Sequence, residues 1–179
     1  MSSASRTWHR WVLLASMVFP LAGMVRAQSA DQSPGDDPNQ GWRADFRAAT
    51  DDEAQVELLR SLEQSDDSTS VLRAGYLAVA HLLVSAQRRN VWAKWRSFSR
   101  WTSRLDALIE QHPNQPELRF LRVTVQSNAP RFLGYADALE EDCGAVSRAL
   151  EAGIWTDDPE HEAFIDRITN EIEACRPQN

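Results

Sequence analysis

The sequence predicts an all-α protein built as a single helical domain. From Trp42 to the end of the chain, apolar side chains recur about every 3.6 residues, the period of an amphipathic helix. No stretch alternates apolar and polar residues or gathers β-branched residues as a strand does. Proline, glycine and capping residues divide the pattern into segments of helical length. We therefore expect a bundle of antiparallel helical hairpins.

Residues 1–27 are predicted to be a cleavable secretory signal. A basic start without acids is followed by an apolar run at 11–25. This run is shorter than the about 20 residues of a membrane span and suits the core of a signal peptide. Small residues around Ala27 indicate cleavage before Gln28. We expect a periplasmic or secreted protein, without a transmembrane segment after cleavage; the alternative is an uncleaved anchor.

The remaining chain divides into a spacer and one domain. Residues 28–40 contain two prolines, a glycine and no large apolar side chain, so they are predicted to be a flexible spacer. Residues 41–179 are predicted to be the all-helical domain. Removal of 27 from 179 residues leaves 152, the usual size of one domain.

The chain without its signal is strongly acidic. The signal holds three of the 19 basic residues and none of the 26 acids, so the net charge becomes 16 minus 26, or −10. Nucleic acid and anionic membranes should repel such a chain as a whole. We expect no nucleic-acid partner, and any contact with an anionic surface would need a local basic patch.

Three helices are predicted in the first half of the domain. The first opens with a capping box, Thr50 and Glu53, and ends near Gln64. The second covers 71–87, where small residues between the apolar positions favour close approach of another helix, so it is the predicted central helix. The third covers 90–112 and stops before a proline.

Three more helices are predicted after this proline. The first covers 114–128, with Pro116 near its first turn, where proline is tolerated. The next covers 135–152 and is capped by Gly153. The last covers 158–174.

The junction at 105–120 carries a first resemblance. A helix that ends in His-Pro-Asn-Gln-Pro-Glu and restarts at once resembles the junction between tetratricopeptide (TPR) helical hairpins. A TPR period of about 34 residues is found nowhere else in the sequence. The resemblance implies a TPR-like hairpin geometry and not a repeat array.

Cys143 and Cys175 are predicted to form a disulfide, because such bonds persist outside the cytoplasm. The bond would join the last helix to the one before it and close a loop of about 33 residues, which stabilises the fold by roughly 3.7 kcal/mol in the chain-entropy model. The alternative is two unpaired buried thiols. Two cysteines alone do not make a metal site, and no metal site is predicted.

The segment 88–104 inverts the charge of the chain, with six basic residues, three tryptophans and no acid. One hypothesis is attachment to an anionic envelope surface through Trp92, Trp95 and Trp101. Another is that Arg96 and Arg100 offer cations to an anionic ligand. In the structural alternative the tryptophans lie in the core and the arginines pair with acids such as those at 140–142.

A second set of candidate binding residues shares a helical face and the turn after it: Arg119, Arg122, Gln126, Asn128 and Tyr135. Guanidinium groups at such spacing bind carboxylates or phosphates in a bidentate manner. In the structural alternative this face pairs with the acids at 140–142, and Phe132 and Tyr135 close the end of the bundle.

The string 117–135 carries a second resemblance. With the basic aromatic helix before it and Glu140-Glu141-Asp142 after it, it resembles a group of small exported proteins of Gram-negative bacteria. That group combines an arginine-containing helix, a Gln-x-Asn-x-Pro step, a Phe-Leu-Gly-Tyr turn and an acidic helix. The resemblance covers roughly 76–146. It implies that these residues act as one unit, and it carries no activity.

Signatures of catalysis are missing from the sequence. His81, His112 and His161 are scattered without a partner at metal-ligand spacing, and there is neither a nucleophile elbow nor a glycine-rich phosphate loop. We predict a non-enzymatic protein without a cofactor. The leading hypothesis is an exported protein-interaction module that binds an acidic protein through Arg96, Arg100, Arg119, Arg122 and Gln126. Envelope attachment is the second hypothesis, and an unrecognised hydrolase is the third.

Overall fold

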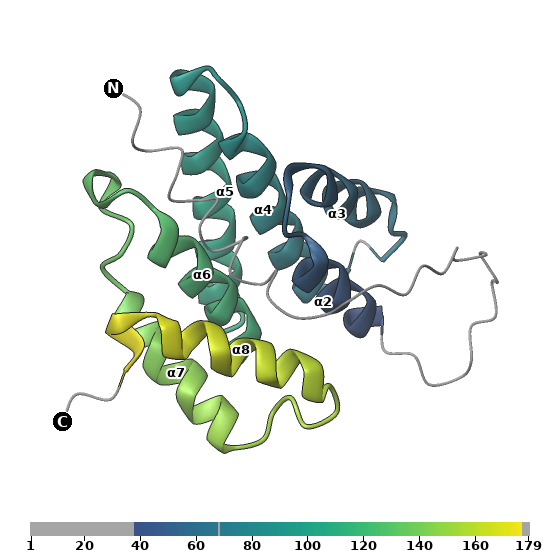
Figure 1. Cartoon of the computed structure of the whole chain (residues 1–179), viewed down its shortest axis with the longest axis vertical. Coiled ribbons are helices and arrows are strands. Elements are labelled where there is room, and N and C mark those ends of the chain that lie inside the picture. The colour runs from purple at the N-terminus through teal and green to yellow at the C-terminus, as the bar shows by residue number, and fades with distance from the viewer. Residues whose placement is uncertain (1–37, 68, 177–179) are drawn as a thin grey trace.

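The computed structural model of the chain describes residues 38–67 and 69–176. These residues form seven α-helices and two short 3-10 helices, and none of them forms a strand. The all-α class and the helical bundle are therefore confirmed (Figure 1). The predicted signal 1–27 and residues 28–37 of the predicted spacer lie outside the described residues.

The first helix of the described chain precedes the six helices that the sequence predicts, so it is an additional helix. Helix α2 (Pro38–Ala48) includes the last three residues of the predicted spacer 28–40, so the domain starts before residue 41. Proline is favoured in the first turn of a helix, where its missing N–H is not needed. Trp42, one turn later, is buried and attaches α2 to the core.

Helix α3 (Asp52–Gln64) starts with a different cap from the predicted one. The carboxylate of Asp51 accepts the N–H of Ala54 at 2.9 Å, so Thr50 and Glu53 do not form the capping box. The N-cap therefore lies one residue later than predicted. A carboxylate caps the helix in place of a hydroxyl, and its negative charge is also stabilised by the positive end of the helix dipole.

Helix α4 (Val71–Ala86) is the central helix, as predicted. It packs against α2, α3, α5 (Val91–Gln111) and α6 (Pro116–Asn128). Gly75 marks a close approach between α4 and α6, because a Cβ atom there would lie 2.5 Å from Leu118 Cδ2 of α6. Consecutive helices pack as neighbouring hairpins, and the finer TPR-like geometry stays a prediction.

Two helices and two short 3-10 helices complete the bundle. After η1 (Arg131–Leu133), helix α7 (Leu139–Glu151) begins four residues later than predicted, and α8 (Pro159–Glu171) ends before η2 (Glu173–Cys175). The late start has a local cause, since Tyr135 is held against α5 by Phe98 and by a hydrogen bond to Asp106.

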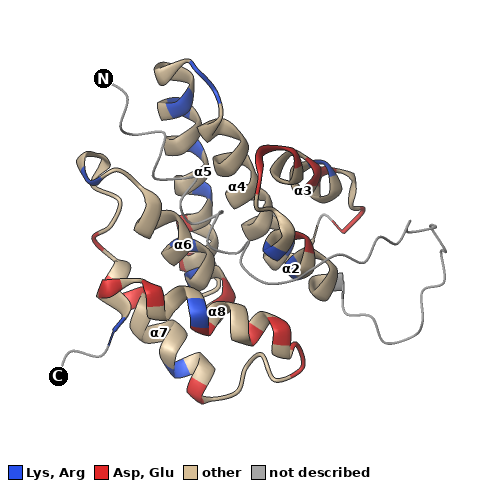
Figure 2. Ribbon diagram, in the orientation of Figure 1, with Lys and Arg blue, Asp and Glu red and all other residues tan. Residues whose placement is uncertain are grey.

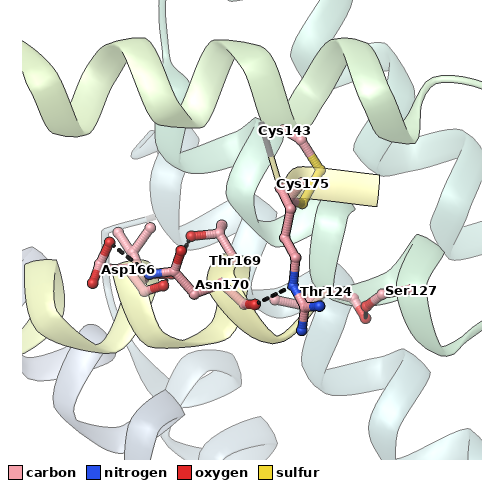
Figure 3. Close-up of a disulfide and its surroundings, with 9 residues drawn as sticks. Thr124, Ser127, Cys143, Asp166, Thr169, Asn170 and Cys175 are labelled. Carbon is pink, nitrogen blue, oxygen red and sulfur yellow. Dashed lines mark hydrogen bonds between the residues drawn. A yellow bond between two sulfur atoms is a disulfide. The ribbon is translucent and has the colours of Figure 1, made fainter. Parts of the chain in front are cut away.

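The disulfide between Cys143 and Cys175 is present, and the two Cα atoms lie 4.9 Å apart. It joins η2 to α7, and Figure 3 shows it above the last turns of α8. The Nε of Arg176 donates to the carbonyl of Asn170 at 3.1 Å, which fastens the same segment to α8. The predicted pairing is confirmed.

Candidate functional site

The N-terminal end of α5 presents large apolar side chains to solvent. Trp92 is 75% exposed and Trp95 is 53% exposed, with the equally exposed Val91 beside them. The buried residues of this helix begin only at Thr102, in its second half. The prediction that the tryptophans lie in the core is therefore wrong for Trp92 and Trp95.

Trp101 differs from the two rings before it. Its ring is partly buried and stacks on His81, with 3.8 Å between ring centroids and 11° between planes. The guanidinium of Arg100 lies 5.3 Å from the ring centroid on the same helix. Burial lowers the pKa of His81, with Arg100 and Arg88 adding to the effect and Glu63 opposing it. Trp101 is therefore part of the packing between α4 and α5.

Basic residues surround the exposed rings. Within the described residues, none of the six basic side chains of segment 88–104 forms an ion pair: Arg88, Arg89, Lys94, Arg96, Arg100 and Arg104. Three exposed arginines follow Trp92 at intervals of four residues, so they line one side of α5. Figure 2 shows these basic positions along α5 and in the loop before it.

We call this region the basic aromatic face. It consists of the exposed residues Arg88, Arg89, Val91, Trp92, Trp95, Arg96, Arg100 and Arg104. It combines apolar area with positive charge that no acid of the described chain neutralises. Both properties favour an anionic partner outside the molecule.

The arginines of α6 are paired within the molecule. Arg119 donates to Asp142 at 2.9 Å and to Glu141 at 3.0 Å. Arg122 donates from Nε and Nη2 to the two oxygens of Asp142 at 2.6 and 2.9 Å, and from Nη1 to Asp106 at 3.1 Å. The hydrogen bond with the fully buried Asp142 is the main cause that raises the pKa of Arg122.

The other members of the second set also have contacts within the molecule or are buried. Gln126 is buried, and the amide of Asn128 donates to the carbonyl of Thr124 at 2.8 Å. The hydroxyl of Tyr135 donates to Asp106 at 2.9 Å; burial and this carboxylate raise the Tyr135 pKa. The candidate residues of α6 and of the turn after it therefore do not form one open binding surface with Arg96 of α5.

A buried polar cluster that the sequence reasoning missed lies around Glu117 of α6. Its carboxylate accepts hydrogen bonds from Arg43 of α2 at 2.9 Å, from the hydroxyl of Tyr76 of α4 and from the indole of Trp155 at 3.3 Å. Burial alone would raise the Glu117 pKa, but the bonds from Arg43, His161 and Tyr76 lower it to about 2. The signal was present, because Glu117 precedes Phe120 and Leu121 at the spacing of a buried helical face.

The same cluster contains a histidine and a carboxylate in contact. His161 Nε2 lies 3.4 Å from Glu117 Oε1, and a histidine this close to a carboxylate is an arrangement that hydrolases use for acid–base catalysis. Both side chains are buried, and the carboxylate is also held by Arg43 and Tyr76. The contacts of this carboxylate join α2, α4 and α8 to α6 in the interior of the bundle. In the described part of the chain, no group of three or more possible ligands is placed to hold a metal ion.

A further aromatic ring lies outside the core, on the turn after α6. Phe132 is 83% exposed, so the prediction that it closes the end of the bundle is wrong. Tyr135 does take that position and packs edge-on against Phe98, with 5.5 Å between ring centroids. Gly134, with a φ of 63°, turns the backbone between the exposed ring of Phe132 and the packed ring of Tyr135.

Comparison with known proteins adds no function to this geometry. None of the helices in the described ranges is long and apolar enough to cross a membrane. The resemblance to small exported proteins of Gram-negative bacteria stays a prediction. No protein-family model, curated protein or solved structure matches the chain.

Proposed function

We propose that this protein is exported and attaches to an anionic envelope membrane through the basic aromatic face. One observation carries the proposal: two exposed tryptophans lie among basic side chains that form no ion pair in the described structure. The protein acts as a peripheral, non-catalytic binding domain.

The chemistry of the face suits a lipid surface. Indole rings prefer the boundary between headgroups and acyl chains, where their apolar body and polar N–H are both satisfied. Each basic residue near an anionic leaflet contributes about 1 kcal/mol. The rest of the chain is acidic, so repulsion should turn every other side of the molecule away from the membrane. Attraction and repulsion together favour one orientation.

Two features support export. The sequence of residues 1–27 has the organisation of a signal peptide. The bonded pair of Cys143 and Cys175 is compatible with a compartment in which disulfides persist. A cell fractionation that locates the processed chain tests this part of the proposal directly, and an unprocessed cytoplasmic chain would contradict it.

A protein partner is the competing function. That hypothesis relied on Arg119 and Arg122, which pair with Asp142 instead. Of the residues proposed to bind a protein partner, only the arginines of α5 remain free for it. The hypothesis also gives no role to the two exposed indole rings. The exposed rings therefore favour the lipid surface over an acidic protein segment.

The test is co-sedimentation of residues 28–179, which contain every described residue, with phosphatidylglycerol-containing vesicles. Binding should fall with added salt, because the screening length shrinks from about 30 Å at 0.01 M to about 8 Å at 0.15 M ionic strength. Trp92→Ala/Trp95→Ala should weaken binding at least about tenfold. Val56→Ala/Ile154→Ala, which removes exposed apolar side chains elsewhere, should bind as the parent does. Absence of sedimentation at low salt would sink the proposal.

A matched pair of charge variants separates the two helices. Arg96→Gln/Arg104→Gln and Arg119→Gln/Arg122→Gln remove the same charge from α5 and from α6. Under conditions where both are folded, only the α5 variant should lose vesicle binding. Loss confined to the α6 variant would return the arginines of α6 to the binding site and refute the role of the basic aromatic face.

Tryptophan emission provides an independent readout. Residues 28–179 contain five tryptophans, of which Trp42 and Trp155 are buried and Trp101 is partly buried. Iodide should therefore quench the emission of Trp92 and Trp95, and anionic vesicles should shift that emission to the blue and protect it. Unquenched emission in the absence of vesicles would show that the rings are covered in solution.

A further inference from the structure

The turn between α6 and α7 exposes a second aromatic ring. Phe132 lies at the centre of η1, with the exposed Arg131 directly before it. Phe132 is the most exposed large apolar side chain of the described residues. An apolar ring next to a cation repeats, on a smaller scale, the composition of the basic aromatic face.

The turn is well fastened, so the exposure of the ring is not the result of a loose loop. The N–H of Leu133 donates to the carbonyl of Pro130 at 2.9 Å, and the N–H of Gly134 donates to the carbonyl of Arg131 at 3.1 Å. Tyr135 then fixes the end of the turn through Asp106, which Arg122 also binds. A ring held in this way loses little conformational freedom when it binds, which favours affinity.

The turn lies alongside the helix that carries the basic aromatic face. Tyr135 packs against Phe98, which follows Trp95 by one turn of α5. In Figure 1 the turn after α6 projects at the left of the bundle and α5 begins at its top, and both lie away from α2. Figure 2 shows a basic position near the tip of the turn and acidic positions only beyond it, toward α7.

We infer that Phe132 and Arg131 form a second contact with the anionic lipid surface. The inference rests on the proposed function and adds the way in which the protein is oriented. Contact through α5 alone would leave the molecule free to rotate about the helix end. A second insertion on a separate element fixes the rotation of the molecule relative to the membrane. The charge of Arg131 selects the same anionic surface as the arginines of α5.

The affinity test replaces the ring. Phe132→Ala should weaken binding to phosphatidylglycerol-containing vesicles about three- to tenfold, since part of one aromatic side chain no longer enters the interface. Phe132→Trp should bind at least as tightly as the parent. Ile154→Ala is the matched control, because Ile154 is 54% exposed on the turn between α7 and α8. All three variants should unfold at the temperature of the parent.

A polarity-sensitive fluorophore attached at residue 132 tests whether this position enters the lipid surface, and the result does not depend on a measured change in affinity. The two native cysteines are bonded to each other, so Phe132→Cys and Ile154→Cys each provide one free thiol for a polarity-sensitive fluorophore. With vesicles, the emission of the label at residue 132 should shift to the blue, and that of the label at residue 154 should stay unchanged.

The outcomes separate this inference from the proposed function. Vesicle binding that depends on Trp92 and Trp95 but is unchanged by Phe132→Ala, with the label at residue 132 remaining in water, would overturn the second contact alone. No binding to any vesicle would overturn both. A blue shift that follows protein concentration without vesicles would assign Phe132 to contact with a second copy of the chain and would also overturn the inference.

Discussion

The arginines of α5 and those of α6 have similar spacing in the sequence and opposite roles in the structure. Arg119 and Arg122 form ion pairs with Asp142 on α7, and Arg122 also pairs with Asp106 on α5. Arg96 and Arg104 lie on the exposed side of α5, and neither forms an ion pair in the described structure. The difference is made by neighbours that are distant in sequence. An arginine without an acid is unexpected in so acidic a chain, and the proposed function accounts for it by placing it against an anionic surface.

This comparison assigns stability and binding to different helices. Charged groups held in the interior stabilise the fold only as complete pairs, since one partner left alone is strongly destabilising. Exposed cations contribute little to stability. Substitution of the arginines of α6 should therefore change unfolding, and substitution of the exposed arginines of α5 should change attachment to anionic vesicles.

The largest loss of unfolding free energy is expected for a substitution of Glu117 in the buried polar cluster. Glu117→Ala leaves the guanidinium of Arg43 buried without its carboxylate, which should cost about 3–5 kcal/mol of unfolding free energy. Urea denaturation followed by circular dichroism measures the loss. Glu110→Ala, at an exposed position of α5, should stay within about 0.5 kcal/mol of the parent. A loss below about 1 kcal/mol at Glu117 would mean that the cluster opens to water.

Low pH should remove the stability that the Glu117 carboxylate provides, because it protonates this group. The Glu117 pKa is lowered from 4.5 to about 2 in the folded protein. A group whose pKa is lower in the folded state stabilises the fold above its unfolded pKa. That stability is lost as the pH falls from 4.5 toward 2, and it amounts to about 3 kcal/mol. The parent should lose this stability in urea titrations over that range, and Glu117→Gln should lack this component of the pH dependence.

The matched arginine variants test the comparison itself. Arg119→Gln/Arg122→Gln should destabilise the fold by about 2–3 kcal/mol, because the buried Asp142 loses the charged donors that hold it. Arg96→Gln/Arg104→Gln should change the unfolding free energy by less than about 0.5 kcal/mol. Equal losses in the two variants would show that the arginines of α5 have internal partners in solution, and the contrast between the helices would disappear.

Local patterns in the sequence were sufficient to predict most of the fold. The apolar period and the prolines predict the helices, and the small residues near Gly75 predict the central position of α4, because these signals act within one or two turns. Helix α2 is not predicted at all, because Pro38 fits a spacer as well as the first turn of a helix. The sequence leaves two roles open for Arg119, binding of a partner and pairing with the acidic run at 140–142, because a helical face does not show which helix it meets.

The candidate site was harder to predict for the same reason. Trp92, Trp95 and Phe98 continue the stripe that ends at Leu105 and Leu108, so periodicity predicts one buried face along the whole helix. Exposure depends on where the neighbouring helices end, and that is set by tertiary packing. The absence of acids in 88–104 was the better signal, since it separates a face that looks outward from one that pairs internally.

The smallest change in stability is expected at the exposed tryptophans, where the comparison can be made within one helix. Trp92→Ala should leave the unfolding free energy within about 0.5 kcal/mol of the parent, because its ring is already in water. Trp101→Ala removes a ring stacked on His81 and beneath Arg100, so it should cost about 1–3 kcal/mol. Vesicle binding should show the reverse order, with the larger loss at Trp92. If both variants lost stability equally, Trp92 would have a covered position in solution, and the membrane attachment would lose its main support.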